Sequence, residues 1–426
     1  MSETSAKVPA PRWHESVILL LAGVAALAPY VIYHRQFLEL YWFGDEFDLI
    51  DQISRLGFWH WVGTAFAENF VPLFKVLWGG AALSFKGSYA VMIAIGWVLH
   101  ACNVILLGRL MRTCSLPWIA VVTAQVMCGL SVANYETLAW SVQWSATLSV
   151  TFMLAGLNRA FMGSAPAAPL GYSLASALSF SRGVLSGPLI GLASFLGDTG
   201  TKLPRRVGKA AVYLAPAALV TALIFALAKG NQHGIGEHLG EATTYGVWYF
   251  CLNPLHELLR VGSWGWRTTL ILGLAKIGLY GWSLARSRGR TRDLFAVLVL
   301  FDLGNAVLLG IGRYHTGLQS AVSSRYQYAA LISFMPMTGF WLAAQWAKLP
   351  TSAVPRKAIF GVLIAGLAAL LCLQWPSELD RFAEWRGTRS RRILFVDVNP
   401  DSQAVPGIPG LPMARAKVLI AEYHLH

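Results

Sequence analysis

Apolar segments of about bilayer length recur along most of the chain and restrict it to a helical membrane fold. A bilayer crossing needs about 20 apolar residues, and the sequence supplies roughly eleven such segments. They lie at residues 16–33, 89–110, 115–132, 138–158, 166–180, 183–197, 209–228, 267–285, 293–312, 326–347 and 358–375. Because 55% of the residues are hydrophobic and 13% are charged, the apolar surface exceeds what a water-soluble core requires. The sequence therefore predicts an all-α polytopic membrane protein.

The first apolar segment is interpreted as a retained membrane anchor. It contains Ala26-Leu27-Ala28, which resembles a signal-peptidase site. The apolar run nevertheless continues through Pro29 to Ile32, as a membrane anchor would. A cleaved leader peptide is the alternative.

Two shorter apolar stretches, 57–66 and 72–85, follow the first segment. The second is interrupted by glycines and carries Lys75, so neither is counted as a crossing. We predict that both lie as interfacial helices, because their tryptophans suit the lipid headgroup region.

Basic residues gather in short clusters between the apolar segments and indicate the topology. With the segments above, these clusters fall on one side of the membrane, which the positive-inside rule makes cytoplasmic. The clusters are Arg109 and Arg112; Arg159; Lys202, Arg205 and Arg206; Arg286, Arg288, Arg290 and Arg292; and Lys348, Arg356 and Lys357. This distribution accounts for the net charge of +13 without nucleic-acid binding. The loop after the first segment is then extracytoplasmic.

The chain divides into a transmembrane part, 1–375, and a C-terminal tail, 376–426. The same topology places the tail on the extracytoplasmic side. The segment from Arg391 to Val398 and the Pro/Gly stretch from Pro406 to Pro412 predict a small strand-and-loop appendage. This appendage either rests on the membrane as a flap or caps the bundle.

Adjacent carboxylates distinguish the first outer loop. Asp45 and Glu46 lie side by side, and Asp48, Asp51 and Glu68 follow. Charges at a membrane edge are costly, and this favours a function for them. A carboxylate here can remove a proton from a hydroxyl acceptor. Solvated loop residues are the alternative interpretation.

Later outer loops carry arginines that can bind phosphate. Arg182 separates two short apolar segments, so its guanidinium needs an anionic partner, either a lipid phosphate or a protein carboxylate. Further candidates on this side are Glu136, Arg313, Tyr314, His315, Arg325 and Tyr326. Arginines with neighbouring tyrosines can clamp a phosphate and stack on a sugar or prenyl group. Snorkelling at helix ends is the alternative.

Four polar residues inside apolar segments are interpreted as structural. Lys276 and Asp302 lie at about the same depth, roughly 15 Å from the cytoplasmic edge, so they can pair across a helical hairpin. A proton relay is the alternative. His100 and Asn103 are predicted to hydrogen-bond between helices.

The N-terminal half resembles a known family. The Asp45-Glu46 pair after a first helix, a Phe70-Val71-Pro72-Leu73-Phe74 segment and a helix opening at Ser88-Tyr89 resemble the GT-C superfamily of integral-membrane glycosyltransferases. Protein O-mannosyltransferases and the aminoarabinose transferase of lipid A share this layout. The resemblance is densest over about residues 16–200. It departs from the family's His-x-Pro-Pro pattern, where this chain has Asn69-Phe70-Val71-Pro72.

This resemblance implies a GT-C-like bundle that uses a polyprenyl-phosphate sugar donor. The acceptor would be an envelope glycan, lipid or protein, reached on the extracytoplasmic face of a bacterial inner membrane. Asp45 would be the general base, Glu46 its catalytic neighbour and Glu68 an acceptor or metal contact. We expect no cofactor and no metal site, with a divalent-cation requirement as the alternative. An envelope polymerase or ligase, and a transporter or flippase, are the alternative functions.

Overall fold

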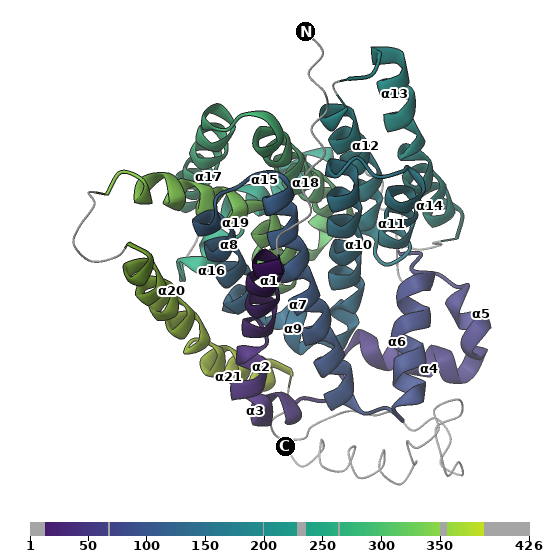
Figure 1. Cartoon of the computed structure of the whole chain (residues 1–426). Helices are drawn as coiled ribbons and strands as arrows, with labels where there is room; N and C mark the ends of the chain where they lie inside the picture. The colour runs from purple at the N-terminus through teal and green to yellow at the C-terminus, as the bar shows by residue number, and fades with distance from the viewer. Residues whose placement is uncertain are drawn as a thin grey trace.

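Every regular element in the described part of the chain is a helix. The computed structural model describes residues 13–66, 69–198, 200–227, 236–262, 265–349 and 356–386. Within these ranges no strand is present, so the architecture is all-α as the sequence predicts (Figure 1).

The N-terminal elements comprise a long helix, two short helices and a side lobe. Their bounds are α1 (Trp13–Ala25), α2 (Ala28–Ile32), α3 (His34–Leu38), α4 (Asp45–Leu56), α5 (Phe58–Val62) and α6 (Pro72–Ser84). The lobe of α4, α5 and α6 lies beside the lower end of the bundle in Figure 1, the end at which α2 and α3 also lie. Helices α5 and α6 fall within the two stretches predicted to be interfacial.

The next elements form one half of the bundle. They are α7 (Tyr89–Thr113), α8 (Trp118–Leu130), η1 (Val132–Asn134), α9 (Tyr135–Ala139), η2 (Ser141–Gln143), α10 (Trp144–Phe161), α11 (Ala167–Ala177), η3 (Ser181–Leu185), α12 (Ser186–Gly197), α13 (Leu203–Val212) and α14 (Leu214–Leu227).

The remaining elements complete the bundle. They are α15 (Leu239–Leu252), α16 (Leu255–Leu258), α17 (Trp266–Arg286), α18 (Gly289–Arg313), η4 (Tyr314–Thr316), η5 (Leu318–Val322), α19 (Ser324–Trp346), α20 (Arg356–Cys372) and α21 (Trp375–Arg386).

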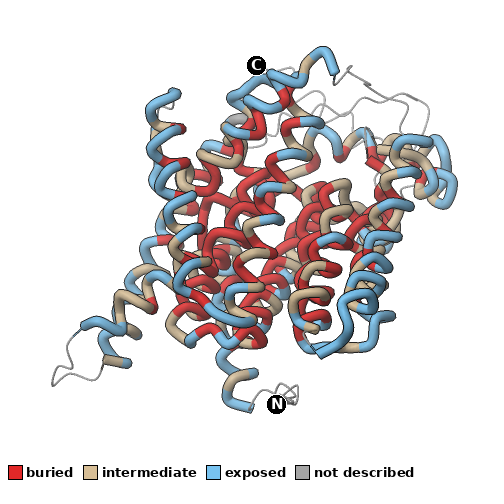
Figure 2. Tube along the Cα trace, turned by 90° about the horizontal axis from the view of Figure 1, so that it is seen from above, coloured by how far each residue is buried: buried red, intermediate tan, exposed pale blue. Residues whose placement is uncertain are grey.

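Five helices in the described ranges are long and apolar enough to cross a membrane. They are Tyr89–Thr113, Leu203–Leu227, Trp266–Arg286, Gly289–Thr316 and Arg356–Glu384, with a sixth if the bent pair Trp118–Leu130 and Val132–Ala139 forms one crossing. Large apolar side chains are exposed on outer helix faces, such as Ile271 at 65% and Val362 at 72%, and exposed residues follow the periphery in Figure 2. Such surfaces mark a membrane protein. Helices lie at all eleven predicted segments, but the eleven crossings stay a prediction.

Helix α15 was not predicted from the sequence. It runs antiparallel to α18 at close range: a Cβ on Gly310 would lie 2.4 Å from the carbonyl oxygen of Ala242, and one on Gly246 would lie 2.8 Å from that of Ala306. Glycine at both positions is therefore what lets the two backbones touch. The sequence did not indicate this helix, because its 14 residues include glutamate, threonines and tyrosines. They are also fewer than the about 20 apolar residues that a bilayer crossing needs.

Lys75 holds the side lobe together. It is fully buried, and its ammonium group donates to the carbonyl oxygens of Trp61 at 2.9 Å and Thr64 at 3.0 Å. Burial lowers the pKa of Lys75 to about 8. Lys75, whose charge was a reason not to count 72–85 as a crossing, thus joins α6 to the end of α5.

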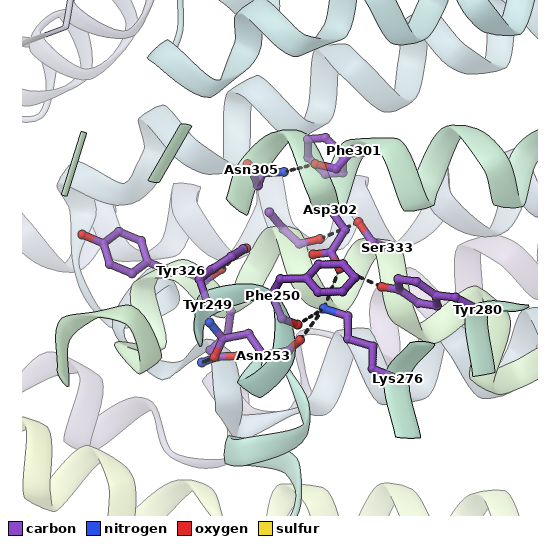
Figure 3. A network of polar contacts seen from close by, with 12 residues as sticks. Tyr249, Phe250, Asn253, Lys276, Tyr280, Phe301, Asp302, Asn305, Tyr326 and Ser333 are labelled. Carbon is purple, nitrogen blue, oxygen red and sulfur yellow. Dashed lines mark hydrogen bonds and ion pairs between the residues drawn. The ribbon is translucent and has the colours of Figure 1, made fainter. Parts of the chain in front are cut away.

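A buried ion pair joins α17 to α18, as the sequence predicts. Lys276 Nζ lies 2.5 Å from a carboxylate oxygen of Asp302, and both side chains are fully buried (Figure 3). The same ammonium group donates to the carbonyl oxygens of Phe250 at 2.8 Å and Asn253 at 2.6 Å. These carbonyl groups lie at the C-terminal end of α15, so the Lys276–Asp302 pair also fixes the helix that packs against α18. Tyr280 donates to Asp302 at 2.9 Å.

The predicted interhelical role of His100 and Asn103 is confirmed. A ring nitrogen of His100 lies 3.0 Å from the hydroxyl of Tyr328 on α19, and Asn103 donates to the same hydroxyl at 2.9 Å. Asn103 also donates to the carbonyl oxygen of Thr147 on α10 at 3.0 Å. The two side chains therefore join α7 to α10 and α19.

Helix α21 carries the chain beyond the predicted boundary at 375/376. Trp375 is fully buried, its indole N–H donates to the carbonyl oxygen of Leu130 at 3.0 Å, and α21 contacts α3 and α9. The tail therefore begins as a packed helix and not as a loose appendage. The strand-and-loop element predicted from Arg391 onward lies outside the described residues.

Replacement of Lys276 by methionine should destabilise the protein strongly. It leaves the Asp302 carboxylate buried without a cation, and breaking a buried pair from one side costs about 3–5 kcal/mol. The expected result is a clear fall in the thermal unfolding midpoint of the purified protein in detergent. The double variant Lys276→Met/Asp302→Leu, which buries no charge, should recover part of this loss.

Lys348→Met, at an exposed position, is the matched control and should unfold like the wild type. Equal unfolding midpoints for Lys276→Met and Lys348→Met would show that the pair has no structural role.

Candidate functional site

A cavity of about 440 Å³ lies where the side lobe meets the bundle. Its walls come from α4, Phe66, the 69–74 segment, η2, the start of α10, η3, the end of α18 and the start of α19. This volume is within the range of small-molecule sites. The cavity brings together five of the predicted site residues: Asp45, Arg182, Arg313, Arg325 and Tyr326.

The acidic side of the cavity is formed by the start of α4. Gly44 precedes the helix with a φ of +53°, a conformation that glycine adopts readily, and this turn places Asp45 in the first helical turn. Asp48 lies three residues on and Gln52 a further four, so the helical repeat puts all three on one face. All three line the cavity. The two carboxylates also suit the positive end of the helix dipole.

The basic side of the cavity is formed by three distant segments. Arg182 comes from η3, Arg313 ends α18, and Arg325 lies in the first turn of α19, followed by Tyr326. Arg325 and Asp45 interact electrostatically. The arrangement therefore sets guanidinium groups and carboxylates on the walls of one cavity.

Arg182 is the most deeply buried of these three arginines. Its side chain is 6% exposed, and its guanidinium lies 4.9 Å from the ring centroid of Phe180. Within the described ranges it forms no salt bridge with a carboxylate. A buried cation is expensive without an anion beside it, so an anionic group placed in this cavity would stabilise the guanidinium of Arg182. The protein-carboxylate alternative from the sequence has no support in the described residues.

Glu46 does not line the cavity. Its fully buried carboxylate accepts hydrogen bonds from the backbone N–H groups of Phe43 at 2.8 Å and Val142 at 3.2 Å, and from the hydroxyl of Ser141. It therefore fastens the start of α4 to η2. This makes Glu46 a positioning residue for Asp45, where the sequence suggested a catalytic neighbour.

Glu136 has a similar positioning role on the basic side of the cavity. Its carboxylate accepts from the hydroxyl of Ser323 and the backbone N–H of Arg325, both at 2.8 Å. Ser324 adds a hydrogen bond to the carbonyl oxygen of Ala133 at 2.7 Å. These contacts hold the first turn of α19, and with it Arg325, against α9. Glu136 is outside the cavity lining.

Tyr314 and His315 are not part of the cavity lining. Tyr314 is buried and stacks on His238, with 5.3 Å between ring centroids. Glu68 lies outside the described residues. In the described ranges no group of three His, Cys, Asp or Glu side chains is arranged to hold a metal ion, and metal independence stays a prediction.

The acidic loop predicted from the sequence includes Asp48, but Gln52, Asn69 and Gln143 were not among the predicted site residues. Gln52 could have been found from its helical spacing to Asp45 and Asp48. Asn69 lies at an isolated bridge and Gln143 ends the short helix η2, and no periodic pattern in the sequence marks them.

Replacement of Glu46 by alanine should destabilise the side lobe. Two backbone N–H groups would lose their acceptor, at about 1–3 kcal/mol each. We expect a fall of several degrees in the thermal unfolding midpoint in detergent. Glu39→Ala removes an exposed carboxylate nearby and should leave the midpoint unchanged; equal midpoints for the two variants would contradict the positioning role.

Comparisons with known proteins do not supply a function. No protein-family model, curated protein sequence or solved structure matches the chain. The cavity and its chemistry are therefore the basis on which a function is proposed.

Proposed function

We propose that the protein is a membrane glycosyltransferase that uses a polyprenyl-phosphate sugar donor. The acceptor would be a hydroxyl group of an envelope glycan, lipid or protein. The observation that carries the proposal is the buried guanidinium of Arg182, which lines a cavity with Asp45 and Asp48 and has no carboxylate partner in the described residues. A lipid phosphate supplies the missing anion.

The cavity residues can divide the reaction between them. Asp45 takes the proton from the acceptor hydroxyl as its oxygen attacks the anomeric carbon of the sugar. The bond between that carbon and the phosphate oxygen breaks, and the polyprenyl phosphate leaves with the electron pair. Arg182, Arg313 and Arg325 bind the phosphate and stabilise the charge that develops on it.

The position of the cavity supports transfer on the extracytoplasmic face. Arg313 ends α18, and the basic turn from Arg286 to Arg292 lies at the other end of this 25-residue helix, about 37 Å away. Thr291 in that turn donates to the carbonyl oxygen of Cys114 at 2.7 Å, so two basic loops share one end. By the positive-inside rule this end is cytoplasmic. The proposed setting is a bacterial inner membrane, with a GT-C-like bundle of eleven crossings.

The two alternative functions find less support in the structure. A polymerase or ligase that depends on His315 is less favoured, because this side chain does not line the cavity. A transporter would use charges near mid-membrane, whereas Lys276 and Asp302 are fully buried and paired with each other.

Asp45→Asn should abolish transfer while the protein stays folded. Loss of a general base lowers the rate about 10²- to 10⁴-fold. Mass spectrometry of envelope glycans and lipids should show the loss of one sugar increment in cells that carry this variant alone. Asp51→Asn is the control, because Asp51 lies on the same helix, pairs with Arg55 and does not line the cavity. Full glycosylation with Asp45→Asn would refute the general-base assignment.

Arg182→Gln should weaken phosphate binding by about tenfold or more, since it removes a charge-assisted contact. The test measures binding of farnesyl methyl phosphate, a singly charged diester, to the purified protein in detergent. Arg205→Gln changes an exposed arginine and should bind like the wild type. Unchanged affinity in Arg182→Gln would remove the main support for a lipid-phosphate donor.

A further inference from the structure

One side of α15 is hydrogen-bonded to the chain segment that leads into α19. Tyr245, Tyr249 and Asn253 follow one another at intervals of four residues, so the helical repeat places them on the same side of α15. All three are fully buried. The hydroxyl of Tyr245 lies 2.8 Å from that of Ser320, and the hydroxyl of Tyr249 donates to the carbonyl oxygen of Tyr326 at 3.3 Å (Figure 3). This side of α15 therefore contacts the segment that carries Tyr326 to the cavity.

Asn253, at the C-terminal end of α15, makes the closest of these contacts. Its amide nitrogen donates to the carbonyl oxygen of Ala321 at 2.7 Å, and its amide oxygen accepts a hydrogen bond from Gln327 at 2.5 Å. Gln327 is also fully buried and lies two residues after Arg325 in the first turn of α19. Asn253 thus contacts both η5 and the start of α19, although it does not line the cavity itself.

Helix α15 is itself held in place by two neighbouring helices. Lys276 on α17 donates to the backbone carbonyl oxygen of Asn253 at 2.6 Å and pairs with Asp302 on α18 (Figure 3). Gly246 and Gly310 bring the backbones of α15 and α18 together. Because α15 is fixed by α17 and α18, it can serve as a support for the start of α19.

We propose that Asn253 is a positioning residue for the phosphate site and acts through Gln327 on Arg325. Glu136 on α9 accepts from the backbone N–H of Arg325, and Asn253 holds the same helical turn from α15. These two contacts keep the guanidinium of Arg325 at the cavity before a ligand arrives, which favours binding because less has to be ordered on association. This inference rests on the proposed function and adds α15 to the support of its phosphate site.

The test measures the affinity of the purified full-length protein for farnesyl methyl phosphate in detergent. Asn253→Ala should lower this affinity about fivefold or more, because Gln327 loses its closest hydrogen-bond acceptor and the first turn of α19 loses its support. Asn158→Ala is the matched control. Asn158 is also buried and joins α10 to α7 through a hydrogen bond to the carbonyl oxygen of Leu106 at 3.0 Å, so this variant should bind the probe like the wild type.

A second background separates positioning from a general effect on stability. In Arg325→Gln the guanidinium that Asn253 positions is absent, so Asn253→Ala should reduce the affinity less in this background than in the wild type. If Asn253→Ala does not give folded protein, Gln327→Met takes its place, because it removes the same hydrogen bond from the other partner.

A measurement without any ligand tests the positioning independently of the proposed function. Phenylglyoxal modifies accessible arginines, and mass spectrometry of the resulting peptides gives the rate at each arginine. Arg325, which is half-buried, should react faster in Asn253→Ala than in the wild type. The exposed Arg205 is the internal reference and should react equally fast in both proteins.

Unchanged affinity in Asn253→Ala, an equal loss of affinity in both backgrounds, or an unchanged rate of Arg325 modification would overturn the inference. Failure of the proposed function looks different. In that case farnesyl methyl phosphate would not bind the wild type, or Arg182→Gln would bind it equally well, while the modification rate of Arg325 would still report whether Asn253 holds it in place.

Discussion

Two buried glutamates hold both sides of the cavity to one short segment, and the site depends on them. The segment 131–143 interrupts the path from α8 to α10 with η1, α9 and η2. Glu46 reaches it from the acidic side and accepts from Val142 N–H, while Glu136 belongs to it and accepts from Arg325 N–H on the basic side. A buried carboxylate that accepts two or three hydrogen bonds is costly to displace. The positions of Asp45 and Arg325 are therefore fixed relative to each other.

This arrangement keeps opposite charges in one cavity without cancelling all of them inside the protein. Arg182 has no carboxylate partner in the described residues, and Asn69 has an unsatisfied amide oxygen there. Polar groups that are held in place before a ligand arrives do not have to reorganise during a reaction, which is how enzymes stabilise developing charge. The buried Lys276–Asp302 pair, by contrast, is satisfied internally and serves the packing of α15 against α18.

The sequence predicted charged residues that line the cavity better than it predicted the buried contacts that hold them in place. The bilayer-length segments and the basic clusters place Asp45, Arg182, Arg313 and Arg325 at one end of the bundle, and the structure joins them in one cavity. The sequence could not separate Asp45 from Glu46, because adjacent residues on a helix point in different directions and only the tertiary contacts decide which one is buried. Helix α15 was missed because its length and polar residues fit neither a crossing nor a loop.

The central claim is that the cavity binds a lipid phosphate beside Arg182. A cryo-EM structure of the protein with bound farnesyl methyl phosphate tests it most directly. The account predicts phosphate density within hydrogen-bond distance, about 3 Å, of the guanidinium of Arg182. The methyl group, which takes the place of the sugar, should point toward Asp45 in the same cavity. Phosphate density at another site, with the cavity around Arg182 unchanged, would contradict the account.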